Sequence, residues 1–176
     1  MAVLEIVSYP DERLKHVSEP VVQFDEALQS FVADLEQTMR ASPGAVGIAA
    51  PQVGRLQRIV IVDVSSAIDR KRTKGQQSSS SNGCMILINP QIARAEGRVV
   101  GREGCLSVPD FTGNVARAAA ISLTAFDPAG RRHEYRCNGF EARAVQHEAD
   151  HLDGLLFLDR LVSPRELFRR KVHRSR

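Results

Sequence analysis

The chain has 176 residues, of which 43% are hydrophobic and 26% are charged, and its net charge is +3. This size and composition predict one ordinary globular domain and exclude a fully disordered chain. No apolar run approaches the roughly 18 residues that a transmembrane helix needs, and the first residues lack the pattern of a secretory or transit signal. Three cysteines are too few for a disulfide scaffold, so we expect a reducing, cytoplasmic location.

The positive charge is concentrated at the C-terminus. Residues 165–176 hold six Arg or Lys and one Glu, so the rest of the chain is mildly acidic. This distribution disfavours a protein that binds DNA over its whole surface. It predicts one domain, 1–164, followed by a basic tail, 165–176. The tail is either a contact for RNA phosphates or the solvated end of a terminal helix.

The first periodic segment predicts an amphipathic helix over 24–40. Asp25 is placed to cap its first turn, and the sequence Ser42-Pro43-Gly44 ends it. Apolar residues recur at three- and four-residue steps, as on one face of a helix. These residues are Leu28, Phe31, Val32, Leu35 and Met39.

The middle of the chain is typical of strands joined by turns. Residues 56–64 are β-branched and apolar, and residues 84–88 resume a strand. Between them, residues 69–83 are rich in serine and basic side chains, which predicts a flexible loop. A hairpin over 118–137 is expected, because Pro and Gly in residues 127–130 suit a type I turn.

A late helix begins near Asn138, where Glu141 three residues later forms a variant of the capping box. Gly154 stands where a helix stops. Strands first and this helix late, with few βαβ alternations, predict an α+β domain with mainly antiparallel sheet.

His147-Glu148-Ala149-Asp150-His151 lies inside this late helix. Two histidines four residues apart stand on one helical face, so both imidazoles can bind one cation. Glu148, beside the first histidine, fits the acid–base group of hydrolytic zinc enzymes. A random chain of this composition shows the pattern about once in a hundred. A surface helix with two unligated histidines therefore remains an alternative at this point.

A catalytic metal site usually has three protein ligands and an open position, so a third ligand is needed. Cys105 is the best candidate, because a thiolate with two imidazoles is a known catalytic zinc set. Gly104 before it allows close backbone approach, although a lone cysteine is more often a core residue. The downstream alternatives are Asp153, Asp159, Glu166 and His173.

Small residues crowd the segment 44–54, whose sequence is GAVGIAAPQVG. They let another backbone approach closely, and Gln52 offers an amide that can donate or accept a hydrogen bond. The segment lacks the lysine of a phosphate-binding loop and a convincing dinucleotide fingerprint. Taken alone, it is compatible with a role in packing.

Together, GIAAPQ, EGCLS and HEADH, in this order, resemble the three signature motifs of peptide deformylases. The resemblance continues in SYPDERLKHVSEPV, INPQI and DHLDGLLFLDRL. It implies mainly antiparallel β-sheets packed around a central helix that carries the HExxH motif. It also implies a hydrolase that removes the N-formyl group, as formate, from the formyl-methionine that begins new polypeptides.

The resemblance also implies roles for individual residues. The implied metal ligands are Cys105, His147 and His151. The implied catalytic groups are Glu148 as acid–base, with the Gln52 amide and the Leu106 N–H as donors to the formyl oxygen. The implied substrate-binding residues are Val46 and Gly47, which could pair with the substrate backbone, and Glu103, Phe140, Arg143 and Ala144 near the methionine pocket. Glu103 could instead orient the site, against Arg117.

The resemblance implies one divalent ion, natively Fe²⁺, with Zn²⁺ or Ni²⁺ as alternatives, and a ribosome as a possible contact of the basic tail. One departure is Ala45, where the family's first motif usually has glycine. If this position requires positive φ, Ala45 is strained by ~1 kcal/mol or more unless Gly44 supplies that freedom. Two other functions remain open: a zinc endopeptidase, and a non-catalytic ribosome-associated binding protein.

Overall fold

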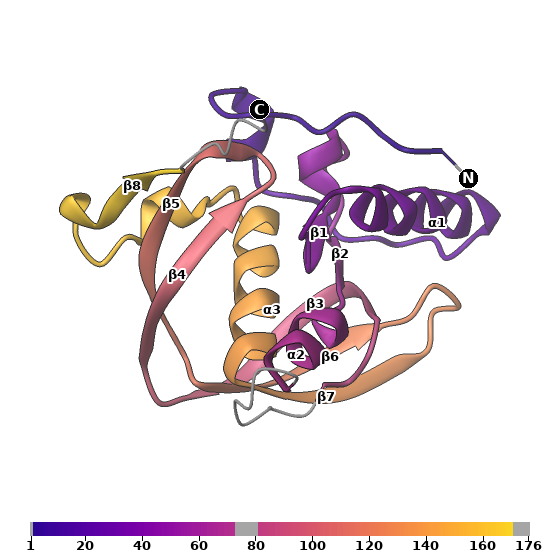
Figure 1. Ribbon diagram of the computed structural model, residues 1–176. Helices are drawn as coiled ribbons and strands as arrows, with labels where there is room; N and C mark the ends of the chain where they lie inside the picture. Colours follow the sequence, from indigo (N-terminus) through magenta and orange to yellow (C-terminus); the bar gives the residue numbers. More distant parts are fainter. Residues whose placement is uncertain (1, 73–80, 171–176) are drawn as a thin grey trace.

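The structure is a computed structural model that describes residues 2–72 and 81–170. Helix α3 (Gly139–Leu152) lies between two antiparallel sheets (Figure 1). The first sheet has the order β1 (Gly47–Ala49), β2 (Ile59–Val62), β3 (Met85–Glu96), β6 (Ala120–Phe126) and β7 (Arg132–Asn138). The second has the order β4 (Val99–Cys105), β5 (Val108–Arg117) and β8 (Leu167–Arg169). This arrangement confirms the predicted α+β fold around a central helix.

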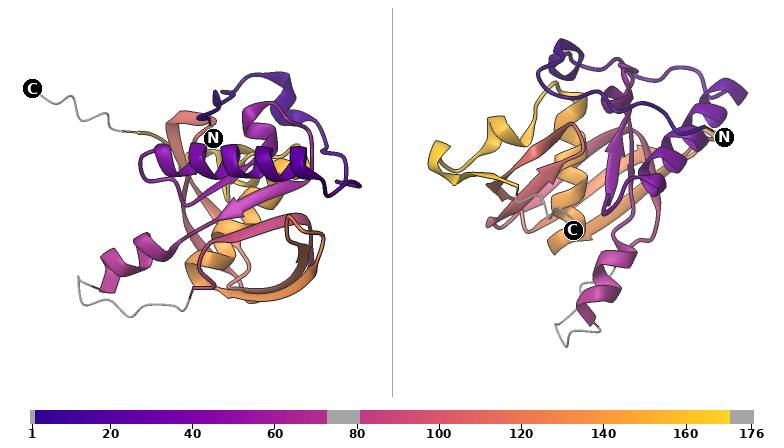
Figure 2. Two further views of the ribbon diagram at one scale, coloured as in Figure 1. Left: turned by 90° about the vertical axis from the view of Figure 1, so that its right-hand side faces the viewer. Right: turned by 45° about the horizontal axis from the view of Figure 1, so that its top comes forward.

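The two faces of the first sheet pack against different helices (Figure 2). In β2, Ile59 and Ile61 belong to the core cluster that includes α1 (Glu26–Ala41), whereas Val60 and Val62 belong to the cluster that includes α3. Successive strand side chains point to opposite faces, so a strand covered on both faces is apolar throughout. This explains why all four residues of β2 are buried.

Helix α1 confirms the prediction for residues 24–40. The carboxylate of Asp25 accepts a hydrogen bond from the Leu28 N–H at 2.9 Å, which satisfies a free donor of the first turn. Of the predicted apolar face, Phe31 is half-buried and the other four residues are buried. Short 3₁₀ helices cover Glu12–Lys15, Ala50–Val53, Phe157–Arg160 and Pro164–Glu166.

The loop expected over 69–83 is wrong at its start, where α2 (Ser65–Arg72) is helical. Ile68 anchors this helix because its side chain is buried in the core cluster that includes α3. The Asp63 carboxylate also accepts a hydrogen bond from the Ser65 N–H at 3.1 Å. Residues 73–80 of the expected loop lie outside the described residues.

The hairpin of β6 and β7 is confirmed, with a hydrogen bond of 2.9 Å from the Gly130 N–H to the Asp127 carbonyl. Helix α3 begins after Asn138 as predicted, but the expected capping box is wrong. The Asn138 side chain makes no capping bond. The buried Glu141 carboxylate instead accepts hydrogen bonds from the Asn82 backbone and side chain, both at 2.7 Å.

The second sheet includes part of the basic segment. Strand β8 pairs with β5, and residues 171–176 lie outside the described residues. None of the helices within 2–72 and 81–170 has the length and apolar character that a bilayer crossing requires.

Candidate metal centre

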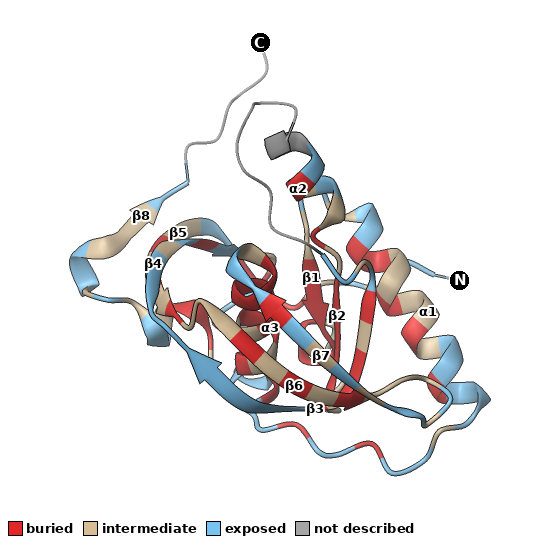
Figure 3. Ribbon diagram, turned by 90° about the horizontal axis from the view of Figure 1, so that it is seen from below, coloured by how far each residue is buried: buried red, intermediate tan, exposed pale blue. Residues whose placement is uncertain are grey.

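Helix α3 carries most of the candidate site. It is buried along most of its length, polar residues included (Figure 3). The face toward the pocket carries Phe140, Ala144 and His147, which recur at four- and three-residue steps, and His151 follows four residues later on the same side of the helix. A surface helix with two unligated histidines is therefore excluded, since His147 and His151 are buried.

Cys105 reaches this helix from the last position of β4. The β4–β5 register shifts between Gly104 and Cys105, so Cys105 pairs with Val108 across a tight connection. Such irregularities change the direction of a side chain next to a site. The Cys105 side chain is thereby buried against the two histidines of α3.

Cys105, His147 and His151 offer ligand atoms that all lie within 4.8 Å of one another. Cys105 Sγ and His151 Nε2 lie 3.3 Å apart. Sulfur and nitrogen atoms bound to one tetrahedral Zn²⁺ would lie about 3.5 Å apart, given their usual bond lengths. The three side chains therefore fit a single divalent ion, and they are the one such group among the described residues.

Glu103 contacts both this cluster and Arg117, as expected for its alternative role of orienting the site. Its carboxylate accepts a hydrogen bond from His147 Nδ1 at 2.8 Å, which leaves His147 Nε2 for a metal. Arg117 donates to both carboxylate oxygens at 3.0 Å, and Arg143 donates to one at 2.7 Å. Burial opposes ionisation, but the hydrogen bonds from His147 and Arg117 outweigh it and lower the pKa of Glu103 to about 2.

The charges of the cluster stabilise one another. Burial alone would raise the pKa of the Cys105 thiol, but the neighbouring His151 and His147 hold it well below its usual value. Burial also works against a charged His147, whose pKa is nevertheless raised by Cys105 and Glu103. A thiolate is the form of cysteine that binds metal ions.

Glu148 lies directly against the backbone of Gly47 in β1. A Cβ atom added to Gly47 would lie 2.5 Å from Glu148 Oε1, so glycine is required for this approach. Glu148 Oε2 is buried with no hydrogen-bond partner within the described ranges. Burial raises the pKa of Glu148 to about 7, which suits a group that accepts and releases a proton near neutral pH.

Gln52 is buried beside the cluster, at the 3₁₀ helix after β1. Its carbonyl oxygen accepts a hydrogen bond from the Ala49 N–H at 2.9 Å. Its amide donates to Cys105 Sγ at 3.3 Å and to Ser107 Oγ at 3.2 Å. The small-residue segment therefore orients the Gln52 amide toward Cys105, and it does more than pack.

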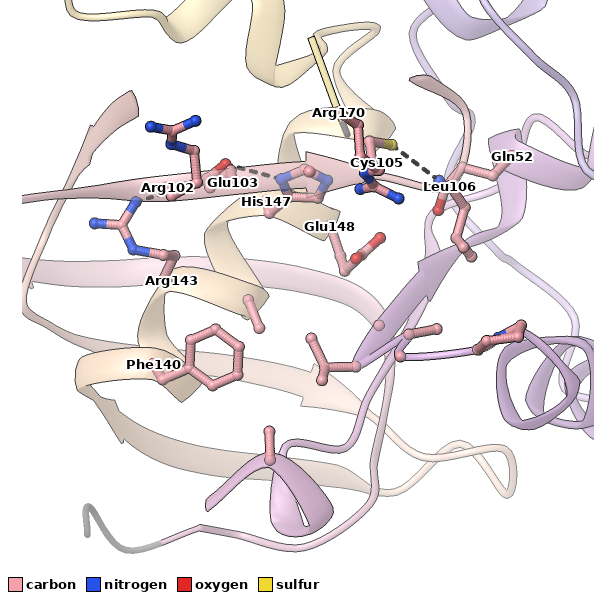
Figure 4. A pocket seen from close by; sticks show the side chains of 18 residues that line it. Gln52, Arg102, Glu103, Cys105, Leu106, Phe140, Arg143, His147, Glu148 and Arg170 are labelled. Atoms are coloured by element: carbon pink, nitrogen blue, oxygen red, sulfur yellow. Dashed lines mark hydrogen bonds and ion pairs between the residues drawn. The ribbon is translucent and has the colours of Figure 1, made fainter. Parts of the chain in front are cut away.

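A pocket of about 320 Å³ lies beside the three clustered side chains (Figure 4). It is bordered by β1 and β4, which each stand at the end of a sheet. The predicted site residues that line it are Val46, Gly47, Gln52, Glu103, Cys105, Leu106, Phe140, Arg143, Ala144, His147 and Glu148. His151 is not among the lining residues, because it is almost completely buried.

Arg143 was predicted near the methionine pocket, and the structure shows where its charge goes. Its guanidinium donates to Glu103, to the Val115 carbonyl at 3.0 Å and to the Val99 carbonyl at 2.7 Å. Arg143 therefore lines the pocket as a side chain whose charge is already paired with Glu103. Seven lining residues were not predicted as site residues, namely Pro43, Gly44, Ala45, Ala67, Arg102, Gly104 and Arg170.

The departure at position 45 causes no strain. Gly44 adopts the positive φ, +75°, whereas Ala45 is not among the described residues with positive φ.

The downstream alternatives for the third ligand are used elsewhere. Asp153 pairs with Arg58, Asp159 with Lys15, and Glu166 accepts a hydrogen bond from Asn114. His173 lies outside the described residues.

A buried cysteine and two histidines, beside the glutamate of an HExxH helix, define the class of metal-dependent hydrolases. The family model of polypeptide deformylases matches residues 3–166. A peptide deformylase of Thermodesulfovibrio yellowstonii is 42% identical over 97% of both chains. One of Alkalilimnicola ehrlichii is 41% identical over 99% of this chain and 89% of its own.

Solved structures agree with this match. The peptide deformylase of Legionella pneumophila has a TM-score of 0.81 and 36% identity, covering 94% of this chain and 89% of its own. That of Thermotoga maritima has a TM-score of 0.80 and 32% identity, covering 93% and 100%. The chain therefore belongs to the polypeptide deformylase family, as its motifs predicted. Members of this family are metalloenzymes.

Proposed function

We propose that this chain removes the N-formyl group, as formate, from the N-terminal formyl-methionine of newly synthesised polypeptides. The observation that carries the proposal is the buried cluster of Cys105, His147 and His151 beside Glu148, with a pocket open to it. Membership of the deformylase family supports the same reaction.

Cys105, His147 and His151 would hold one divalent ion, and we propose Fe²⁺ as the native one, with Zn²⁺ or Ni²⁺ as alternatives. One sulfur and two imidazole donors favour such ions over Mg²⁺ or Ca²⁺, which prefer oxygen ligands. When bound, the ion would act as a Lewis acid on the formyl oxygen and lower the pKa of a water molecule at its open position.

The remaining chemistry belongs to the side chains around this cluster. Glu148 takes a proton from the attacking water and passes it to the amine nitrogen as the C–N bond breaks, so that formate and a free amino terminus result. The Gln52 amide and the Leu106 N–H donate to the formyl oxygen as its negative charge grows. Loss of one such donor should lower the rate by ~10²–10³.

The substrate backbone would lie between β1 and β4, because each of these strands ends its sheet and borders the pocket. An extended peptide can add to such an edge through main-chain hydrogen bonds, here at Val46 and Gly47. The methionine side chain would contact Phe140, Ala144 and the aliphatic stem of Arg143. A formylated terminus has no charge, which suits a pocket whose Arg143 is already paired with Glu103.

The test is formate release from formyl-Met-Ala-Ser-amide by protein purified without oxygen. Wild-type protein should release formate, whereas Glu148→Ala should not, although it should keep its metal. Cys105→Ser should lose both metal and activity. A zinc endopeptidase would instead cleave internal bonds of an unformylated peptide. Cleavage of internal bonds without formate release would therefore overturn the proposal.

We also propose that residues 1–164 form the catalytic domain, to which β8 adds an edge strand, that the protein acts in the cytoplasm, and that the basic end of the chain contacts ribosomal RNA. The positive excess of residues 165–176 supports the RNA contact. Because β8 pairs with β5, the informative deletion removes residues 171–176 alone. Pelleting with ribosomes that is unchanged by this deletion, or insensitive to salt, would contradict the RNA contact.

A further inference from the structure

Arg170 brings an unneutralised positive charge to the pocket. It follows β8 directly, and its N–H donates to the Asp110 carbonyl at 2.7 Å, so the pairing of β8 with β5 continues to this residue. Its side chain lines the pocket from the β4 side, near Cys105 and Leu106 (Figure 4). A residue distant in sequence from all three motifs thus borders the path of the substrate.

The guanidinium of Arg170 lies against the bare backbone of Gly104. A Cβ atom at Gly104 would lie 2.5 Å from Arg170 Nη2, so the motif glycine leaves the space that this group occupies. Within residues 2–72 and 81–170, the guanidinium has no hydrogen-bond or ion-pair partner, and the residue is exposed. Its charge is available to a ligand.

The two other arginines that line the pocket are committed. Arg143 is paired with the buried Glu103. Arg102 donates to Asn114 and Thr112, and its guanidinium lies 3.7 Å from the centroid of the Phe168 ring. Because Phe168 belongs to β8, this contact holds in place the strand that presents Arg170.

We infer that Arg170 selects substrates by charge, favouring acidic over basic side chains at the positions that follow formyl-methionine. This inference rests on the proposed function. A formylated terminus is neutral and the methionine side chain is apolar, so the first charges that a substrate brings stand on its second and third residues. A free cation beside the pocket attracts carboxylates there and repels ammonium groups.

The test compares kcat/KM for metal-loaded enzyme on amidated tripeptides. Formyl-Met-Glu-Ser and formyl-Met-Lys-Ser vary the second position, formyl-Met-Ala-Glu and formyl-Met-Ala-Lys vary the third, and formyl-Met-Ala-Ser is the neutral reference. The ion pair between Arg170 and a substrate carboxylate would be exposed. We therefore expect kcat/KM for the glutamate peptide to exceed that for the lysine peptide by about three- to tenfold at one of these positions. The difference should lie in KM and fall toward one in 1 M salt.

Arg170→Ala and Arg170→Gln should bring the ratio close to one, and Arg170→Glu should invert it. Arg169→Ala is the matched control. Arg169 is the residue before Arg170, and its side chain points to the opposite face of the strand and does not line the pocket. This control should keep the wild-type ratio. A wild-type ratio of one, or a ratio unchanged in all three Arg170 variants, would overturn the inference while leaving deformylation intact. Absence of formate from the neutral peptide would overturn the proposed function instead.

Discussion

At the scale of single residues, the site depends on close approaches that leave no room for added atoms. Gly47 shows this most clearly, because the carboxylate of Glu148 occupies the space that a side chain would fill. The glycine of the family motif thus leaves room for a glutamate that lies 101 positions later in the chain. Backbone freedom is not the reason, since Gly47 does not adopt positive φ.

Gly47→Ala should therefore displace Glu148 and reduce kcat for formate release by roughly 10- to 100-fold, because small errors in position cost large factors in rate. Metal content and the thermal midpoint should stay close to those of wild-type protein. Steady-state kinetics with metal analysis checks this. A kcat within twofold of wild type would show that the carboxylate need not occupy this place.

Glu103 is a second residue whose effect is transmitted through its neighbours. It forms ion pairs with Arg117 and Arg143 and orients His147, and all four side chains are buried. Glu103→Gln should weaken metal binding by about 10- to 100-fold and lower the free energy of unfolding by about 3 kcal/mol. Competition with a chelator measures the affinity, and urea unfolding measures the stability. Wild-type metal affinity in this variant would contradict the orienting role.

At the scale of elements, helix α1 supports the first sheet from the face opposite to the site. Asp25→Ala removes the carboxylate that caps its first turn and should lower the free energy of unfolding by about 1 kcal/mol. Activity should not change, because the helix does not line the pocket. Asp25→Asn, which can still cap, is the matched control, and equal loss in both variants would contradict the capping role.

The elements also show what local patterns can predict. The cap of α1, the turn at 127–130 and the two histidines of α3 depend on neighbours within a few positions, and each was predicted correctly. Glu141 was mispredicted because its partner, Asn82, lies 59 positions away. Helix α2 was missed because its buried anchor, Ile68, stands among polar residues.

At the scale of the whole molecule, the site exists because two sheets and one helix meet. Cys105 comes from the second sheet, Gln52 from the 3₁₀ helix that follows β1 of the first sheet, and His147 from the helix between the sheets (Figure 4). The motifs predicted this meeting only through their resemblance to a family. Arg170 lay beyond that resemblance, because it reaches the pocket only when β8 folds back over β5.

A bound ion would join Cys105 of the second sheet to His147 and His151 of α3, so its removal should affect stability as well as activity. Dialysis against a chelator should abolish formate release and lower the thermal midpoint, because a ligand of the folded state stabilises it by mass action. Return of Fe²⁺ under anaerobic conditions should restore both. A midpoint unaffected by chelation, in protein shown to have lost its metal, would contradict a structural link between the second sheet and α3 through the ion.

The most direct test of the account is X-ray absorption spectroscopy at the metal edge of protein purified anaerobically. We predict one ion per chain with one sulfur at about 2.3 Å and two imidazole nitrogens at about 2.0–2.1 Å, and no bound ion in Cys105→Ser. A spectrum of the active wild-type enzyme without a sulfur neighbour would contradict the central claim that Cys105 completes the metal site.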